Sequence, residues 1–157
     1  MRNALINVIW TIIGFFPICL FWYYEEINFL FYILLLTAFL AGCLSERVYI
    51  SLHISKDIKV YEKLGVRFVR RFMQTGNFSK NRGSGIKGYL KELSMFERYH
   101  YICLVFFQAT AFYACFNHKL ILALLVACSN LIYNVYPILL QQYNKIRMLK
   151  IYRTVLN

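Results

Sequence analysis

Long runs of apolar residues without a charged side chain are the feature that most restricts how this chain can fold. Four such runs occur, at about residues 4–24, 27–44, 99–116 and 120–143. An α-helix of about 20 apolar residues spans a hydrocarbon layer about 30 Å thick. Because backbone that faces lipid must satisfy its hydrogen bonds within its own helix, each run predicts a transmembrane helix.

The separations between the runs predict how these helices are connected. Only Glu25 and Glu26 separate the first two runs, and residues 117–119 separate the last two, so each pair predicts a helical hairpin. A cleaved signal peptide is disfavoured, because the first run is longer than the roughly 7–15 apolar residues of such segments. A hydrophobic share of 60% and a mean hydropathy of +0.50 also disfavour a soluble domain.

The expected fold is therefore an all-α integral membrane protein. Four transmembrane helices form two hairpins, with a basic cytoplasmic amphipathic helix and loop between them. We expect a single membrane domain over residues 1–157. Its parts are a first helical hairpin at 1–45, a basic cytoplasmic segment at 46–98, a second hairpin at 99–144 and a basic cytoplasmic tail at 145–157.

The placement of positive charge predicts the orientation in the membrane. The net charge is +11, and most of the eighteen basic residues lie in the central segment: Arg47, Lys56, Lys59, Lys63, Arg67, Arg70, Arg71, Lys80, Arg82, Lys87, Lys91 and Arg98. Basic loops stay in the cytoplasm, so both termini and the central segment are expected there. Basic residues next to membrane helices favour anionic lipid headgroups or an anionic substrate as partners, and not nucleic acid.

The central segment contains a predicted amphipathic helix from Asp57 to about Gln74. Its apolar residues recur every three or four positions, and its opposite side carries basic residues expected at the membrane surface: Lys63, Arg67, Arg70 and Arg71. This helix could lie flat on the cytoplasmic leaflet or pack on the protein's own cytoplasmic ends, and the periodicity fits both equally. A flexible loop is expected from Thr75 to Gly88, because it contains four glycines among polar residues.

Several classes of function are disfavoured by motifs that the sequence lacks. The five cysteines include no C-x-x-C pair, which argues against a thiol oxidoreductase and against a disulfide framework. No H-E-x-x-H motif is present, which argues against a membrane zinc protease. We expect no cofactor and no bound metal.

Two polar residues at the start of the third apolar run are candidate catalytic groups. Glu97 and His100 are three residues apart, so they share one face of a helix. A carboxylate beside an imidazole fixes its tautomer and raises its basicity, as a general base requires. Gln108, an amide deep in the same run, continues this face as a candidate substrate contact.

The fourth apolar run carries a second set of polar residues. Asn130, Asn134, Gln141 and Asn144 repeat at helical spacing together with Pro137, and Arg147 follows three residues later. Amides in hydrocarbon need partners, so they face other helices or a wet cavity. Hydrogen bonds between helices would explain one or two of them. Four amides and an arginine fit better with a polar cleft between the third and fourth helices, opening toward Glu97 and His100.

At these residues the sequence resembles the glycosyl-4,4'-diaponeurosporenoate acyltransferase family, small bacterial membrane proteins that esterify a sugar hydroxyl of a carotenoid glycoside with a fatty acyl chain. Glu97 and His100 match a Glu-x-x-His element of the family. Asn134, Val135, Gln141, Tyr143, Asn144 and Arg147 match its closing motif, in which Lys145 replaces the usual arginine. Residues 61–65 resemble a further aromatic-Glu-Lys-x-Gly element.

The resemblance implies a membrane-embedded acyltransferase of the bacterial inner (cell) membrane. It would esterify a hydroxyl of a glycosylated or other lipid acceptor at the cytoplasmic face. The expected catalytic residues are Glu97 and His100, and the expected substrate-binding residues are Gln108, Asn130, Asn134, Gln141, Tyr143, Asn144 and Arg147. Expected partners are membrane lipids, an acyl donor and the acceptor, and a homo-oligomer or larger complex is possible. The alternative function is a non-enzymatic membrane scaffold or accessory subunit, in which the amides simply join helices.

Overall fold

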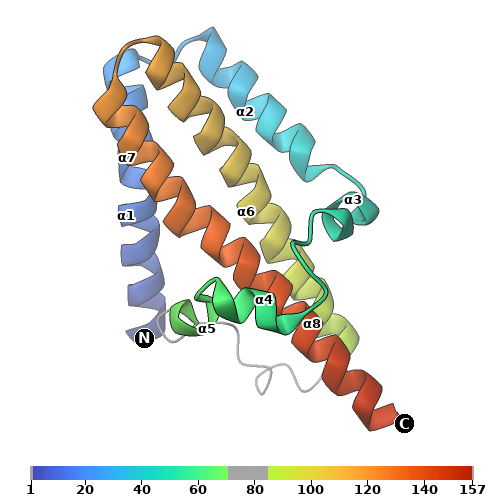
Figure 1. Cartoon of the computed structure of the whole chain (residues 1–157). Helices are drawn as coiled ribbons and strands as arrows, with labels where there is room; N and C mark the ends of the chain where they lie inside the picture. Colours follow the sequence, from blue (N-terminus) through green and yellow to red (C-terminus); the bar gives the residue numbers. More distant parts are fainter. Residues whose placement is uncertain (1, 71–84, 157) are drawn as a thin grey trace. The chain divides into compact units, whose positions relative to one another are not determined.

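The structure is a computed structural model, and it describes the backbone of residues 2–70 and 85–156 and the side chains of residues 8–70 and 85–152 (Figure 1). The described residues form α1 (Arg2–Glu25), α2 (Phe29–Gly42), α3 (Glu46–Ser51), α4 (Ile58–Lys63), α5 (Val66–Val69), α6 (Gly85–Phe116), α7 (Leu120–Asn130), the π-helix η2 (Leu131–Val135) and α8 (Tyr136–Leu156). The prediction of an all-α protein is confirmed.

Within the described residues, three helical stretches are long and apolar enough to cross a membrane. They are Val8–Glu25, Gly85–Phe116 and Leu120–Tyr152. The second predicted span is represented by α2, which has 14 residues and is therefore about 21 Å long. The α2 helix starts late because the Asn28 side chain caps it by accepting from the backbone N–H of Leu30 and Phe31. A fourth membrane crossing therefore remains a prediction.

The chain divides into two compact units, and each is described by itself. Unit 1 comprises residues Met1–Leu44 and Tyr99–Val135, and unit 2 comprises Ser45–Arg98 and Tyr136–Asn157.

The core of unit 1 is made of aromatic and small side chains. The α1 helix packs on α7 and η2, and Phe21, Phe107 and Val126 are completely buried. Trp22 packs in this cluster and donates from its indole N–H to the Thr110 hydroxyl at 3.2 Å. An aromatic side chain with a polar atom is accommodated in an apolar core when that atom finds a partner, which is the case here.

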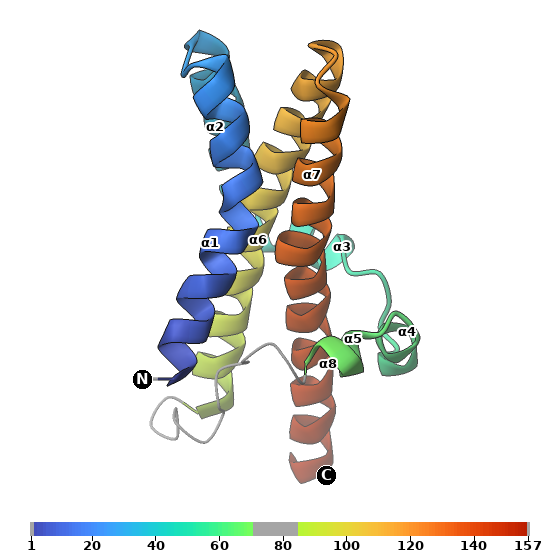
Figure 2. The same cartoon turned by 90° about the vertical axis from the view of Figure 1, so that its left-hand side faces the viewer.

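The amphipathic segment of unit 2 packs on α8, which is one of the two positions considered for it. The short helices α4 and α5 both pack on α8 (Figure 2), with Tyr61 and Val66 completely buried. The predicted single helix is wrong, because it is interrupted at Gly65, which has a positive φ of 77°. Only glycine adopts this backbone conformation without steric cost. The segment therefore packs on the protein itself, while Leu64 and Phe68 remain exposed.

Part of the central segment lies outside the described residues. This applies to Arg71 and to positions 75–84 of the predicted loop. Positions 85–88 were also predicted to belong to the loop, but they form the first turn of α6.

We predict that Gly14→Ala destabilises unit 1, whereas Gly42→Ala is tolerated much better. A Cβ at Gly14 would lie 2.4 Å from the rigid ring of Tyr133, and one at Gly42 would lie 2.5 Å from the flexible end of Ile102. Overpacking typically costs about 1–3 kcal/mol. Thermal unfolding in detergent micelles should show a loss of about this size for the first variant only. Equal losses in both would contradict the proposed close packing of α1 on η2.

Candidate functional site

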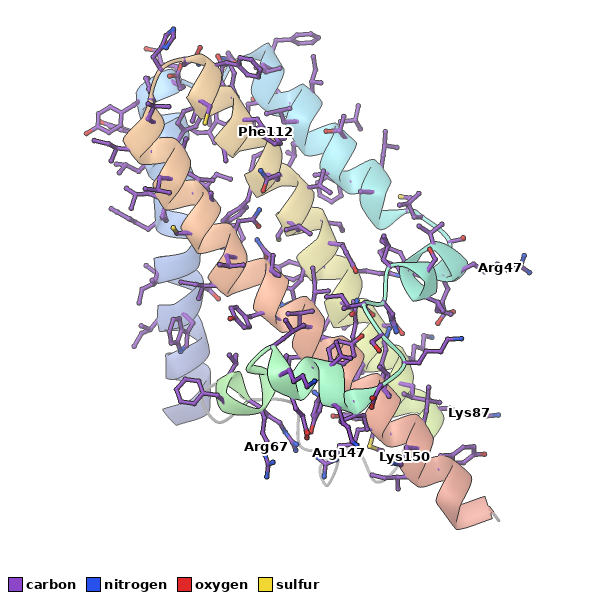
Figure 3. All side chains as sticks on the ribbon, viewed as in Figure 1. Arg47, Arg67, Lys87, Phe112, Arg147 and Lys150 are labelled. Carbon is purple, nitrogen blue, oxygen red and sulfur yellow. The ribbon has the colours of Figure 1, made fainter. Side chains whose placement is uncertain are left out.

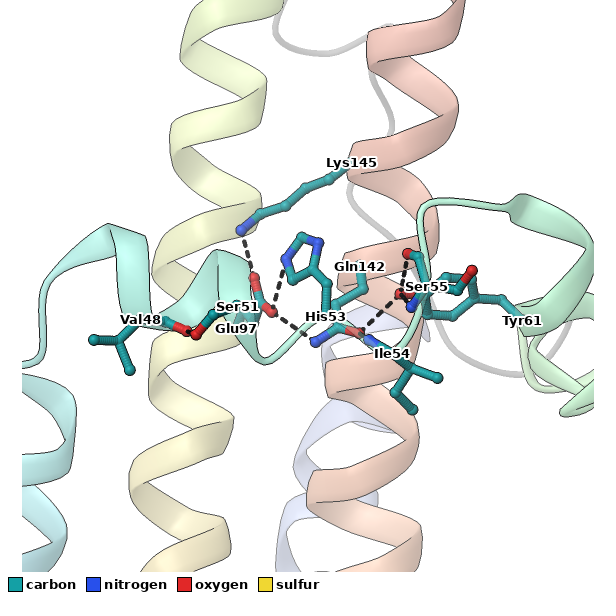
Figure 4. A network of polar contacts seen from close by, with 9 residues as sticks. All are labelled: Val48, Ser51, His53, Ile54, Ser55, Tyr61, Glu97, Gln142 and Lys145. Carbon is teal, nitrogen blue, oxygen red and sulfur yellow. Dashed lines mark hydrogen bonds and ion pairs between the residues drawn. The ribbon is translucent and has the colours of Figure 1, made fainter.

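A buried polar network in unit 2 is centred on Glu97 (Figure 4). Glu97 lies on α6 and is only 1% exposed. From α8, Lys145 forms an ion pair with its Oε2, and Gln142 Nε2 donates to its Oε1 at 3.1 Å. His53, between α3 and α4, places its Nε2 3.5 Å from the same Oε1, a contact that becomes an ion pair when the imidazole is protonated. The Glu97 carboxylate thus links α6 to α8 and to the segment between α3 and α4.

Gln142 extends the network to α4. Its Oε1 lies 3.1 Å from the Tyr61 hydroxyl and accepts from the backbone N–H of Ile54 at 3.4 Å. Tyr61 also contacts the Ser55 carbonyl at 3.0 Å. Burial raises the pKa of Tyr61, and the nearby charge of Glu97 raises this pKa further. The phenol therefore remains a neutral donor, which suits a position near a buried carboxylate.

Two amides of α8 have buried atoms without a partner among the described residues. They are Oε1 of Gln141 and Nδ2 of Asn144. An unsatisfied polar atom out of contact with water costs about 1–3 kcal/mol. Neighbouring Tyr143 is buried, whereas Arg147 is exposed. The two unpaired atoms are one acceptor and one donor, so they could bind a ligand that has both kinds of group.

A second polar chain lies in unit 1 and contains His100. The Asn134 Oδ1 lies 3.5 Å from Nδ1 of the imidazole. Asn134 Nδ2 donates to Asn130 Oδ1 at 2.8 Å, and Asn130 Nδ2 donates to the Leu104 carbonyl at 3.2 Å. The Tyr133 ring lies 5.9 Å from the imidazole, edge to face. Asn134 and Tyr133 thus contact His100 from the π-helical turn η2, and Asn130 continues the chain of hydrogen bonds into α7.

The structure therefore gives the two predicted catalytic residues separate surroundings. Glu97 belongs to unit 2 and His100 to unit 1, and each has partners within its own unit. Their mutual pairing remains a prediction. Gln108 is exposed on α6 and borders a hollow of about 290 Å³ in unit 1 that Ala111 and Ala123 also line. Its role in substrate binding also remains a prediction.

Sequence reasoning did not assign His53, Tyr61, Gln142 and Lys145 to the site. His53 carries no local signal, because the fold alone brings it to Glu97. Gln142 was not selected because its neighbour Gln141 has the helical spacing of the other polar residues in this run. Lys145 could have been found, since it stands where the resembled family has an arginine, and a buried carboxylate requires a cation.

Basic side chains project from unit 2, as Figure 3 shows for Arg47, Arg67, Lys87, Arg147 and Lys150, all of them exposed. Of the residues expected at the membrane surface, Lys63 and Arg67 are exposed and Arg70 is half-buried. No group of three or more His, Cys, Asp or Glu residues that could hold a metal ion occurs within the parts of the chain that the structure describes.

We predict that Lys145→Met destabilises the protein by about 3–5 kcal/mol, because it leaves the Glu97 charge buried without its cation. Adding Glu97→Gln should restore much of that stability by removing the uncompensated charge. A double-mutant cycle of unfolding free energies in detergent measures this coupling. Additive losses from the two changes would show that the pair contributes nothing as a pair.

The chain matches the family of glycosyl-4,4'-diaponeurosporenoate acyltransferases over residues 45–154. No curated protein and no solved structure shows a significant match to it. The matched region contains the Glu97 network and the His100 chain, and it begins at the first residue of unit 2. On this evidence the chain belongs to the glycosyl-4,4'-diaponeurosporenoate acyltransferase family and has an acyltransferase role.

Proposed function

We propose that this acyltransferase esterifies a hydroxyl of a glycosylated or other lipid acceptor at the cytoplasmic face of the bacterial inner membrane. The observation that carries the proposal is the half-buried imidazole of His100, held by Asn134 at 3.5 Å from its Nδ1. An acceptor hydroxyl is a poor nucleophile until a base removes its proton. His100 supplies that base, and the family membership supplies the reaction class.

The proposed topology has four membrane crossings with both termini in the cytoplasm. The three long apolar helices support three of the crossings, and α2 would make the fourth. A helix of about 21 Å can cross if the bilayer thins locally, at a modest cost. The exposed Lys63 and Arg67 beside the exposed Phe68 suit contact with anionic headgroups.

Glu97 would serve the reaction by holding Lys145 and Gln142 in fixed positions on α8. Gln141 and Asn144 would bind the substrate through the two atoms that lack partners among the described residues. The exposed guanidinium of Arg147 would hold an anionic part of the acyl donor.

We predict that His100→Ala folds but does not transfer acyl groups, because no base then activates the acceptor. His118→Asn is the matched control, since His118 lies exposed in a turn with a positive φ of 58° that asparagine tolerates. Mass spectrometry of lipids from a deletion strain complemented with each variant would measure the acylated product. Normal product levels with His100→Ala would refute the assigned base.

We also predict that Gln141→Leu and Asn144→Leu raise KM without lowering the unfolding free energy. The reason is that each change removes a buried polar atom that has no partner in the part of the chain that the structure describes. Gln142→Leu is the contrasting control, because its amide makes hydrogen bonds to Glu97 and Tyr61 and its loss should destabilise the protein. Unchanged KM in the first two variants would show that these amides do not touch the substrate.

A further inference from the structure

The hydrogen bonds of the His100 chain have a fixed direction, and it is set at the Leu104 carbonyl. A carbonyl oxygen only accepts, so the Asn130 atom that faces it at 3.2 Å is the amide nitrogen. The Asn130 oxygen therefore faces Asn134 and accepts from its Nδ2 at 2.8 Å. This arrangement turns the Asn134 oxygen toward Nδ1 of His100.

The consequence concerns the proton on the imidazole ring. An amide oxygen only accepts, so a hydrogen bond to it requires the hydrogen on Nδ1. In the neutral imidazole, a hydrogen on Nδ1 leaves the lone pair on Nε2. A separation of 3.5 Å is long for such a bond, and bonds of this kind commonly tighten when the substrate binds.

The two asparagines are buried, which leaves them little exposed surface for contact with a substrate. Asn130 is 2% exposed and Asn134 is fully buried. Rotating the Asn134 amide by half a turn would place its NH₂ group against Nδ1 and bring two oxygens together at Asn130. That arrangement loses a buried hydrogen bond, so the observed orientation is strongly favoured.

We propose that Asn130 and Asn134 are positioning residues. They hold His100 in the tautomer with Nδ1 protonated and Nε2 free, and this proposal rests on the proposed function of His100 as the base. The sequence led us to expect that they contact the substrate, and the proposal gives them this different role. Unlike a carboxylate, a neutral amide orients the ring without placing a negative charge beside it.

The proposed step is balanced as follows. Nε2 takes the proton of the acceptor hydroxyl while the hydroxyl oxygen bonds to the acyl carbon of an activated donor of the thioester class. The bond from the acyl carbon to sulfur then breaks, and the imidazolium returns the proton to the leaving thiolate. The products are an ester and a free thiol, and His100 ends in its starting tautomer.

The first test reads the tautomer directly. The chain has three histidines, so ¹⁵N-histidine labelling of the full protein in detergent gives few signals, and His100→Gln assigns the one of interest. The ¹⁵N chemical shifts at a pH where the ring is neutral should show Nδ1 protonated. A hydrogen on Nε2 instead would overturn the proposal, whatever the activity of the enzyme.

The second test separates positioning from substrate contact. Asn134→Leu should lower kcat by about 100-fold or more with KM changed less than about twofold, because the tautomer is lost. Asn134→Asp keeps an acceptor opposite Nδ1 and, while its carboxyl is protonated, a donor toward Asn130 Oδ1, so it should retain clearly more activity than Asn134→Leu. Asn130→Ala should lower kcat by about 10-fold, since it frees the Asn134 amide to rotate.

The outcomes distinguish this proposal from the one on which it rests. A raised KM with unchanged kcat in Asn134→Leu would show substrate contact and overturn the positioning role, while His100 remained the base. Full activity of His100→Ala would refute the base itself. If Asn134→Leu does not fold, Asn134→Asp and Asn130→Ala decide the matter together with the ¹⁵N spectrum.

Discussion

Polar groups enclosed away from water are costly unless they have partners, and this constraint organises both units of the chain. In unit 2 the constraint is severe, because a carboxylate is almost fully buried and is stabilised by a cation and an amide close by. In unit 1 the groups are neutral, and the amides of Asn130 and Asn134 satisfy each other in sequence. The charged network suits a structural role, and the neutral hydrogen bonds suit the proposed role of His100 as a base.

The helices could be predicted from the sequence because their signal is local. Uninterrupted apolar runs led directly to α1 and α6 and to the continuous α7, η2 and α8. Two features could not be read in this way. The length of α2 depends on the cap at Asn28, and the break between α4 and α5 depends on the left-handed backbone at Gly65. A glycine within an amphipathic pattern is compatible with either a continuous or a broken helix.

The sequence allowed us to predict several residues of the candidate site, but not which of them contact one another. The sequence pointed to Glu97, His100 and the amides of the last span as polar groups that need partners. The partner of each depends on contacts between residues far apart in the chain, such as His53 with Glu97 and Asn134 with His100. Helical spacing places two residues on one face, but it does not show which neighbouring element will compete for them. The proposed assignment gives the orienting role to an amide, an arrangement also used by Cys-His-Asn proteases.

Two exposed thiols of unit 1 lie at different levels along the helices, so their reactivity would report how deeply each level is inserted in a bilayer. Cys43 and Cys115 are both exposed and unoxidised. Cys43 follows Gly42, which packs against Ile102, and Cys115 lies thirteen residues beyond Ile102 on α6. At 1.5 Å per residue this places the two residues about 20 Å apart along the axis of α6. Reagents that differ in how far they penetrate lipid would therefore reach these two native atoms unequally, without any engineered label.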